Sequence, residues 1–418
     1  MVGGMANEME RVVVVGASLA GLRAAETLRN PGGEIEPFAG EVVVIGAEPH
    51  RPYDRPPLSK KLLAGEWEPD RIHLRQPDSF DALDVEWRFG VAASSLDVRE
   101  RRVMLSDGTS LDFDGFIIAT GATCRRLPDQ GRHDHVHEVR TVDDAMRLRA
   151  ELADGGRRVV VIGAGFIGLE VAATAKALGN EVTVLEGADA PLVRGLGAEM
   201  GRAIGAMHET RGVAIRCGVT VDRLVDDGVV LGDGEEVAAN VIVVGIGVVP
   251  ATRWLEGSGL ELRDGVVCDE TLLARLADGS PVSDVYAAGD VLRWPNPLYD
   301  GEEMRVEHWT NAAEQGALAA SNLISESSGQ PTEAYAPVPF FWSEQYDRRI
   351  QFLGRAGLDD DVRVVDGSVD ERRFTALFGR AGRLRGVLGV NMPRNVMPFR
   401  KHLLDRIGFD DAVAIATG

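Results

Sequence analysis

The sequence has few cysteines, no long apolar run and no excess of positive charge. Its 418 residues include only three cysteines, Cys124, Cys217 and Cys268, which lie far apart and form no Cys-x-x-Cys pair. This pattern disfavours dithiol chemistry and fits a reducing cytoplasm. No apolar run reaches the ~18 residues of a membrane-spanning helix, and the short polar start MVGGMANEMER does not resemble a signal peptide. The formal charge of −20 argues against binding to nucleic acid or anionic membranes.

The bulk composition is that of an ordinary globular protein, with 44% hydrophobic and 26% charged residues. A chain of this length predicts about two to four domains, each with its own core. No group of residues has metal-ligand spacing, so we expect no bound metal.

Residues 331–418 carry 13 Lys/Arg and 12 Asp/Glu, so this segment is close to neutral on an otherwise acidic protein. Such a segment is one candidate docking face for an acidic partner, and ordinary variation of charge along a chain is the alternative.

The most informative stretch is Val159–Glu186, which predicts a strand, a glycine turn, a helix and a second strand. Gly163, Gly165 and Gly168 form a complete G-x-G-x-x-G directly after the strand. In this motif the first glycine permits a tight turn, the second lets a pyrophosphate approach the backbone, and the third lets the helix pack closely. Glu186 ends the second strand, where an acid binds adenosine ribose hydroxyls and repels a 2′-phosphate. The stretch therefore predicts a dinucleotide site that prefers NADH over NADPH.

The pattern occurs a second time near the N-terminus, over Glu10–Leu28. A strand leads into Gly16-Ala17-Ser18-Leu19-Ala20-Gly21, in which Ser18 replaces the middle glycine. Serine is small, and its hydroxyl and N–H can still serve a phosphate. The next predicted strand, Glu41–Gly46, is followed by Glu48, the natural ribose ligand. Two such turns in one chain, each with its acid, imply two dinucleotides.

A second internal repeat supports duplication. Val103–Ala122 and Val229–Val248 both read as a hairpin with an Asp-Gly turn, followed by a buried strand that ends at glycine. The segment Ser283–Val291 predicts a short strand that returns to the first domain. It precedes an amphipathic helix, which we expect to begin near Thr310 or Asn311 with a capping box formed by Asn311 and Glu314.

These patterns predict an α/β fold with two Rossmann-like domains and a C-terminal α+β domain. Strands are expected over Tyr335–Phe352 and Val362–Val390 of the C-terminal domain. The expected domains are residues 8–124 with 253–330 for FAD, 125–252 for NADH, and 331–418 at the C-terminus.

Taken together, the motifs resemble the two-dinucleotide flavoproteins of the pyridine nucleotide-disulfide oxidoreductase superfamily. Within it the chain is similar to the NADH-dependent ferredoxin reductases of oxygenase and cytochrome P450 systems, such as the putidaredoxin, rubredoxin and biphenyl-dioxygenase ferredoxin reductases. The resemblance covers nearly the whole chain. Its most discriminating part is Arg51-Pro52-Tyr53-Asp54-Arg55-Pro56-Pro57-Leu58-Ser59-Lys60, where disulfide reductases carry a redox cysteine pair. It also includes Ile118-Ala119-Thr120-Gly121, the GAGFIGLE turn, Ala288-Gly289-Asp290, Glu307-His308-Trp309 and Phe340-Phe341-Trp342-Ser343.

The resemblance implies FAD in the first Rossmann domain and NADH in the second. The residues implied to contact FAD are Gly16, Ser18, Ala20, Gly21, Glu48, Arg55, Lys60, Ala93, Thr120, Gly121, Arg140, Gly289, Asp290, Trp309 and Trp342. Those implied to contact NADH are Gly163, Gly165, Ile167, Gly168, Glu170, Glu186, Arg194, Gly245 and Gly247. The helix that follows Trp309 would point its positive dipole end at the flavin.

Two residues are expected to act in catalysis. Lys60 would place a cation beside the isoalloxazine ring and stabilise negative charge there. The resemblance implies that Glu170 binds the nicotinamide carboxamide, and the two side chains could form an ion pair. His308 also invites a catalytic interpretation, but hydride transfer needs no general base. Ordinary alternatives for Lys60 and Glu170 are a solvated lysine and a charge on a helix surface.

The resemblance implies that electrons pass from NADH through FAD to a small ferredoxin, of the [2Fe–2S] or another type. We expect no nucleic-acid or membrane partner, a monomer or homodimer, and a cytoplasmic location. One alternative is an NADH oxidase or an NADH-dependent rubredoxin or quinone reductase. Another is an NADH-sensing protein similar to apoptosis-inducing factor, although the targeting segment and long inserted loops of those proteins are not visible here.

Overall fold

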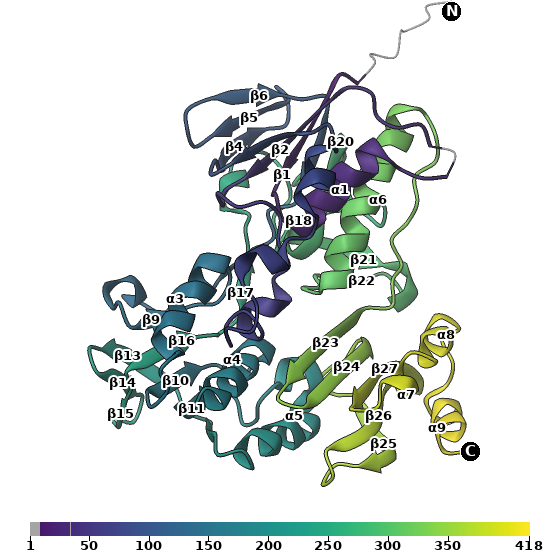
Figure 1. Cartoon of the computed structure of the whole chain (residues 1–418). Coiled ribbons are helices and arrows are strands. Elements are labelled where there is room, and N and C mark those ends of the chain that lie inside the picture. Colours follow the sequence, from purple (N-terminus) through teal and green to yellow (C-terminus); the bar gives the residue numbers. More distant parts are fainter. Residues whose placement is uncertain (1–8, 34) are drawn as a thin grey trace, which may run out of the picture. The chain divides into compact units, whose positions relative to one another are not determined.

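A computed structural model describes residues 9–33 and 35–418 of the chain (Figure 1). The expected domain start at residue 8, and most of the polar stretch MVGGMANEMER, lie outside the described residues. By packing, the chain divides into two compact units. The first unit holds the described residues up to Asp54, His73–Thr123 and Val249–Pro337. The second unit holds Arg55–Ile72, Cys124–Val248 and Val338–Gly418. The finer division into three domains stays a prediction.

The first unit is built on a six-stranded sheet with helices packed against it. Its strand order is β19 (Leu273–Arg275), β20 (Pro281–Ala287), β7 (Gly115–Ile118), β1 (Arg11–Val15), β2 (Glu41–Gly46) and β3 (Glu86–Phe89). All neighbours pair in parallel except β19 and β20. Because β20 pairs with β7, the segment predicted to return to the first sheet does so. The helices of this unit are α1 (Leu19–Arg29), α2 (Pro77–Asp81) and α6 (Trp309–Ser327).

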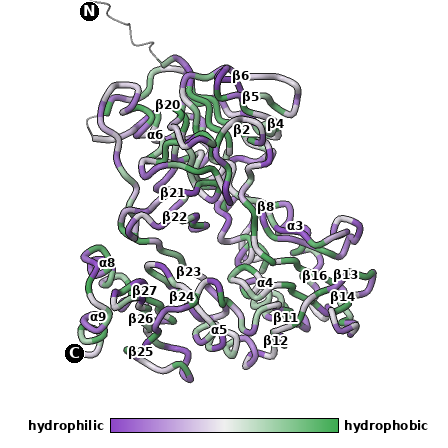
Figure 2. Tube along the Cα trace, turned by 180° about the vertical axis from the view of Figure 1, so that it is seen from behind, coloured by the Kyte–Doolittle hydropathy of each residue, from purple (hydrophilic) through white to green (hydrophobic). Residues whose placement is uncertain are grey.

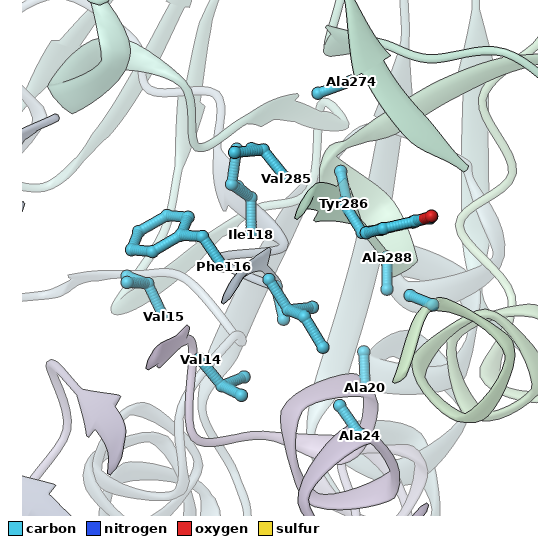
Figure 3. Close-up of a cluster of buried hydrophobic side chains, with 14 of the residues drawn as sticks. Val14, Val15, Ala20, Ala24, Phe116, Ile118, Ala274, Val285, Tyr286 and Ala288 are labelled. Atoms are coloured by element: carbon cyan, nitrogen blue, oxygen red, sulfur yellow. The ribbon is translucent and has the colours of Figure 1, made fainter. Parts of the chain in front are cut away.

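The core of the first unit lies where the strands meet α1 and α6. Figure 3 shows Val14 of β1 on the side of Ala20 and Ala24 of α1, whereas Phe116 of β7 lies beside Val15. Val14, Phe116 and Ala24 have no exposed surface, and a fully buried Val or Phe side chain stabilises a fold by about 1.5–3 kcal/mol. The two helices approach closely because residue 316 is glycine. A Cβ atom there would lie 2.2 Å from the carbonyl oxygen of Ala20.

The second unit contains a five-stranded parallel sheet of the same kind. Its order is β12 (Ala214–Cys217), β11 (Glu181–Glu186), β10 (Arg158–Ile162), β16 (Val241–Val244) and β9 (Val136–His137). Its helices are α3 (Val142–Leu152), α4 (Phe166–Ala177) and α5 (Val193–Glu209). Strand β10 and helix α4 match the strand and helix predicted around the complete glycine motif. Figure 2 shows that apolar residues lie along the strands, whereas the loops are mostly hydrophilic.

The predicted duplication is confirmed by two small antiparallel sheets. One consists of β4 (Ala93–Asp97), β5 (Arg102–Leu105) and β6 (Ser110–Asp112), and the other of β13 (Val221–Val225), β14 (Gly228–Leu231) and β15 (Glu236–Ala238). The predicted turns contain Gly108 and Gly234, whose φ angles of 85° and 88° favour glycine. The remaining small sheets are β8 (Ala122–Cys124) with β17 (Val248–Pro250), and β18 (Val266–Val267), β21 (Leu292–Asn296) and β22 (Glu302–Met304).

The C-terminal segment is α+β, as predicted, and packs as part of the second unit. Its antiparallel sheet has the order β23 (Phe340–Gln345), β24 (Arg348–Gly354), β27 (Arg383–Val390), β26 (Arg373–Arg380) and β25 (Asp361–Ser368). The helices α7 (Pro393–Val396), α8 (Phe399–Leu404) and α9 (Phe409–Thr417) follow it. Within the residues that the structure describes, no helix is both long enough and apolar enough to cross a membrane.

The predicted cap of α6 is wrong. The helix begins at Trp309, and its N-cap is His308, which makes no side-chain capping hydrogen bond. Asn311 lies inside the first turn, where its Nδ2 donates to the carbonyl oxygen of Val306 at 3.1 Å. Its Oδ1 accepts from the hydroxyl of Tyr335 at 3.2 Å. Hydrogen bonds to the nearby backbone of Val306 and to the distant Tyr335 therefore use the amide that local spacing assigned to a cap.

Candidate dinucleotide-binding sites

The first glycine turn connects β1 to α1. Gly16 has a φ angle of 122°, and a Cβ atom there would lie 2.1 Å from the carbonyl oxygen of Ala119. At Gly21 a Cβ atom would lie 1.8 Å from the carbonyl oxygen of Gly16, so glycine lets the helix start against its own turn. Ser18 is the N-cap of α1, and its hydroxyl makes no capping hydrogen bond. The turn thus presents a helix N-terminus and a small polar side chain, which suit a phosphate.

The second glycine turn has the same construction between β10 and α4. A Cβ atom at Gly163, whose φ is 102°, would lie 2.4 Å from the carbonyl oxygen of Gly245. At Gly168 it would lie 2.1 Å from the carbonyl oxygen of Gly163. Gly165 differs, because a Cβ atom there meets no heavy atom within 4 Å. The protein's own packing requires the outer glycines, whereas the middle one keeps open space before the helix, as a pyrophosphate needs.

Each turn has an acid at the end of the following strand. Glu186 Oε2 accepts a hydrogen bond from the backbone N–H of Ala164 at 2.7 Å. Its Oε1 accepts from the N–H of Ala188 at 2.9 Å, so the carboxylate is fixed beside the turn. In the first unit, Glu48 accepts a hydrogen bond from the hydroxyl of Tyr53. Both acids occupy the place where ribose hydroxyls bind in Rossmann folds.

Most residues predicted to contact FAD belong to the first unit. Thr120 Oγ1 donates to the carbonyl oxygen of Ala251 at 2.9 Å, and Gly121 accepts from the N–H of Ala251. Trp309 Nε1 donates to Asp54 Oδ1 at 2.7 Å. The first unit holds Gly16, Ser18, Ala20, Gly21, Glu48, Ala93, Thr120, Gly121, Gly289, Asp290 and Trp309, and the second holds Arg55, Lys60, Arg140 and Trp342. Contacts of all these residues with FAD stay predictions.

Gln315 of α6 was not predicted as part of this site. Its Oε1 accepts the backbone N–H of Gly289 at 2.9 Å, and the side chain is fully buried. It therefore fixes the backbone directly before Asp290, one of the residues that the resemblance implies to contact FAD. The predicted amphipathic helix contained Gln315, but its spacing alone did not show which strand end the amide would reach.

All residues predicted to contact NADH belong to the second unit. Ile167, in the first turn of α4, is an apolar side chain with 49% of its surface exposed. Arg194 is exposed in the first turn of α5, which is interrupted at Gly197. Gly247 has a φ of 97°, and its carbonyl oxygen accepts from the N–H of Arg125 at 2.9 Å. Their contacts with NADH stay predictions.

The ion pair expected between Lys60 and Glu170 is present. Lys60 Nζ lies 2.8 Å from Glu170 Oε2, and the two side chains are 15% and 3% exposed. Ser59 Oγ donates to the same oxygen at 2.5 Å, and Ser343 Oγ donates to Glu170 Oε1 at 2.6 Å. A buried carboxylate is stable as an anion only when it is paired and hydrogen-bonded in this way. The alternatives of a solvated lysine and a surface glutamate are therefore wrong.

Ser59 and Ser343 were not predicted as site residues. Ser59 directly precedes Lys60, and Ser343 ends the quoted Phe340-Phe341-Trp342-Ser343 motif, so both lay within stretches that the resemblance had marked. The missing information was spatial, because Glu170, Ser59 and Ser343 come from three separate segments. Thr174 of α4 adds a further link by donating to the carbonyl oxygen of Ser59 at 2.8 Å.

The cysteine thiols are not activated. Burial, followed by the charge of Glu138, raises the pKa of Cys124 to about 11. Burial also raises the pKa of Cys217 and of Cys268 above their usual range. Because the thiolate is the reactive form, these residues are poorly suited to redox chemistry.

Two buried histidines make stability depend on pH. Burial lowers the pKa of His208 and of His308 to about 4, from a usual value near 6.5. Between these values the unfolded chain binds protons that the folded chain does not, so stability is complete above about pH 6.5 and falls toward pH 4. We expect the protonation of each histidine to lower the free energy of unfolding by about 3 kcal/mol between pH 6.5 and pH 4. In urea unfolding at pH 7, 6 and 5, the free energy of unfolding of His208→Gln should fall less with decreasing pH than that of the wild type. An identical pH dependence in the two proteins would contradict this assignment.

The paired glycine turns, each at the end of a strand with parallel neighbours, place the protein in the class of α/β oxidoreductases with two dinucleotide-binding domains. The chain belongs to the pyridine nucleotide-disulphide oxidoreductase family, which it matches over residues 10–316. Residues 340–417 match the reductase C-terminal family.

Individual relatives support the same family assignment. The chain is 38% identical to rhodocoxin reductase of Rhodococcus erythropolis, over 94% of this chain and 89% of that protein. It is 37% identical to the ferredoxin–NAD(+) reductase component of the anthranilate 1,2-dioxygenase system of Burkholderia cepacia, over 93% of each. The structure is similar to the ferredoxin reductase for the CYP199A2 system from Rhodopseudomonas palustris, with a TM-score of 0.88, 33% identity and 98% of each chain covered. The resemblance inferred from the sequence is confirmed.

Proposed function

We propose that this protein is an NADH-dependent ferredoxin reductase that holds FAD and passes electrons to an iron–sulfur ferredoxin of an oxygenase or cytochrome P450 system. The observation that carries the proposal is the duplicated turn. Each unit has a strand, a glycine turn and a helix N-terminus, with Gly16 and Gly163 both in backbone conformations that favour glycine. Together with the lack of an activated thiol among the three cysteines, this favours a relay between two dinucleotides over disulfide chemistry.

The residues of the chain have distinct tasks in this proposal. The turns at Gly16 and Gly163 would hold the two pyrophosphates, while Glu48 and Glu186 would bind the adenosine ribose hydroxyls. Bound FAD would supply the chemistry, since flavins accept electrons in pairs and release them singly. Lys60, held by Glu170, would place a positive charge beside the isoalloxazine ring. Glu170 would orient the nicotinamide carboxamide.

We propose a small ferredoxin, of the [2Fe–2S] or another type, as the partner. Several relatives are named as reductases of ferredoxins, which supports a small iron–sulfur acceptor. The nearly neutral residues 331–418 would meet an acidic partner with less repulsion than the rest of the chain, which carries a formal charge of −21. A cytoplasmic location and a monomer or homodimer stay predictions.

The test is steady-state electron transfer with a [2Fe–2S] ferredoxin as acceptor and cytochrome c as the final reporter. We expect cytochrome c reduction to require NADH, the FAD-loaded protein and the ferredoxin together. Failure with several ferredoxins, accompanied by slow reoxidation and NADH-induced dimerisation, would instead favour an NADH-sensing protein similar to apoptosis-inducing factor. The chain is 33% identical to apoptosis-inducing factor 3 of Homo sapiens over 91% of its length, and it covers 60% of that protein.

The preference for NADH should depend on Glu186. We expect Glu186→Ala to raise the KM for NADH roughly tenfold, because the ribose hydroxyls lose their acceptor. The KM for NADPH should fall, since the carboxylate no longer repels a 2′-phosphate. Glu181→Ala, at the exposed start of the same strand, is the control and should leave both values unchanged. A KM for NADH that is the same in Glu186→Ala and in the wild type would contradict this role.

A further inference from the structure

A chain of hydrogen bonds continues from Glu170 into the C-terminal sheet and on to α5. Ser343 Oγ donates to Glu170 Oε1 at 2.6 Å, and Gln345 Nε2 donates to Ser343 Oγ at 3.1 Å. Gln345 Oε1 then lies 2.8 Å from His208 Nε2, and His208 Nδ1 lies 3.2 Å from the hydroxyl of Tyr346. Ser343 and Gln345 are two apart on strand β23, so their side chains leave the same face of the sheet.

The carboxylate sets the direction of every bond in this chain. An ionised Glu170 can only accept, so the hydroxyl of Ser343 must give it its single proton. Ser343 Oγ then accepts from Gln345, which requires the amide nitrogen of Gln345 on that side. The amide oxygen consequently faces His208 and needs a proton on Nε2. His208 Nδ1 is left as an acceptor for the hydroxyl of Tyr346, so all donors point toward Glu170.

This chain of hydrogen bonds is shielded from water. His208 and Gln345 have no exposed surface, and Ser343 is 1% exposed. Burial lowers the pKa of His208 to about 4, which keeps the ring neutral at physiological pH, as the direction of the bonds requires. At the outer end, the guanidinium of Arg211 lies over the Tyr346 ring at 4.5 Å and also pairs with Asp347.

The acceptor capacity of Glu170 is almost fully used by these contacts. A carboxylate offers about four lone-pair sites. Lys60 and Ser59 take two at Oε2, and Ser343 takes one at Oε1. One site remains at Oε1, beside the hydrogen bond from Ser343, which suits a single ligand N–H.

We propose that Ser343, Gln345 and His208 are positioning residues for nicotinamide recognition, because their one-directional chain fixes the Glu170 carboxylate so that its remaining site accepts the carboxamide N–H of NADH. This inference rests on the proposed role of Glu170. It gives strand β23 of the C-terminal segment an indirect part in nucleotide binding, because Ser343 and Gln345 would act through Glu170.

Reversing the direction of the chain tests the proposal. In Gln345→Glu a carboxylate of the same shape still accepts from His208, but it cannot donate to Ser343 and competes with Glu170 for the Ser343 proton. We expect the Kd for NAD+, measured by calorimetry on the FAD-loaded protein, and the KM for NADH both to rise roughly tenfold. The kcat should stay within about twofold, because the variant loses binding that substrate and transition state share. Ser343→Ala should give the same result if Gln345→Glu does not fold.

Two variants serve as controls, one in a strand of the same sheet and one directly after a strand of it. Thr375→Val removes another buried hydroxyl, and Asn391→Asp makes the same amide-to-acid change without reaching Glu170. Both should bind NAD+ as the wild type does. Nitrogen-15 NMR of histidine-labelled wild-type protein should find His208 neutral with its proton on Nε2.

The outcomes separate this inference from the proposed function. If the wild type reduces ferredoxin while Gln345→Glu and Ser343→Ala both keep wild-type NAD+ affinity, the positioning role is overturned and the reductase function stands. A proton on Nδ1 of His208 would also overturn the inference, whatever the activity. If the wild type neither binds NAD+ nor oxidises NADH, the proposed function fails, and the inference fails with it even where His208 shows the expected tautomer.

Discussion

Replacing Gly165 with valine is expected to abolish NADH binding while leaving the fold intact. The backbone at Gly165, with φ −75° and ψ 178°, suits valine, and a Cβ atom there meets nothing within 4 Å. The new side chain would fill the space that we assign to the pyrophosphate. We expect the Kd for NAD+ to rise at least ~100-fold, which corresponds to about 3 kcal/mol, with FAD content and thermal stability unchanged.

Two further glycine variants make this result specific. Gly131→Val places a side chain in similarly open space elsewhere in the second unit and should bind NAD+ normally. Gly163→Val should instead destabilise the protein, because its Cβ atom would lie 2.4 Å from the carbonyl oxygen of Gly245 and its φ is 102°. Unchanged NAD+ affinity in a folded Gly165→Val protein would show that this turn is not the phosphate site.

The second large effect is expected from Lys60→Met. Removing one member of a buried ion pair costs about 3–5 kcal/mol, because the other charge is left without compensation. Glu170 is 3% exposed and Lys60 is 15% exposed. We therefore expect urea unfolding to show a loss of about 3 kcal/mol in the free energy of unfolding. The rate of flavin reduction by NADH in stopped flow should fall roughly 50-fold, since the cation that we propose beside the flavin and the orientation of Glu170 would both be lost.

A double variant separates stability from chemistry. Lys60→Met combined with Glu170→Gln leaves no unpaired charge, so it should regain most of the stability but not the rate. Lys61→Met is the matched control, because Lys61 is exposed and its ammonium lies over the Trp67 ring at 4.7 Å. A Lys60→Met protein that binds FAD and is reduced by NADH at the wild-type rate would remove the flavin-tuning role.

The sequence could predict features whose geometry is local. A glycine turn between a strand and a helix is set by neighbouring residues, so the turns at Gly16 and Gly163 and the acid Glu186 were found from spacing alone. The Asp-Gly hairpins were found for the same reason. The Lys60–Glu170 pair was expected through the resemblance, because no local pattern connects the two residues.

Features that depend on distant segments were missed. The partners of Glu170 come from Ser59 and Ser343, and the continuation to His208 joins β23 to α5. A buried histidine in an amphipathic helix carries no local signal of its partner. The capping box at Asn311 failed partly for this reason, since the distant Tyr335 binds that amide, as does the nearby backbone of Val306.

Electron transfer from NADH through FAD to ferredoxin can be followed directly in an anaerobic titration of the FAD-loaded protein with NADH, followed by addition of oxidised [2Fe–2S] ferredoxin. We expect one FAD per chain, complete loss of the oxidised flavin absorption with one NADH, and reduction of two ferredoxin molecules as that absorption returns. Flavin that stays oxidised in the presence of NADH, or reduced flavin that passes no electrons to ferredoxin, would contradict this expectation.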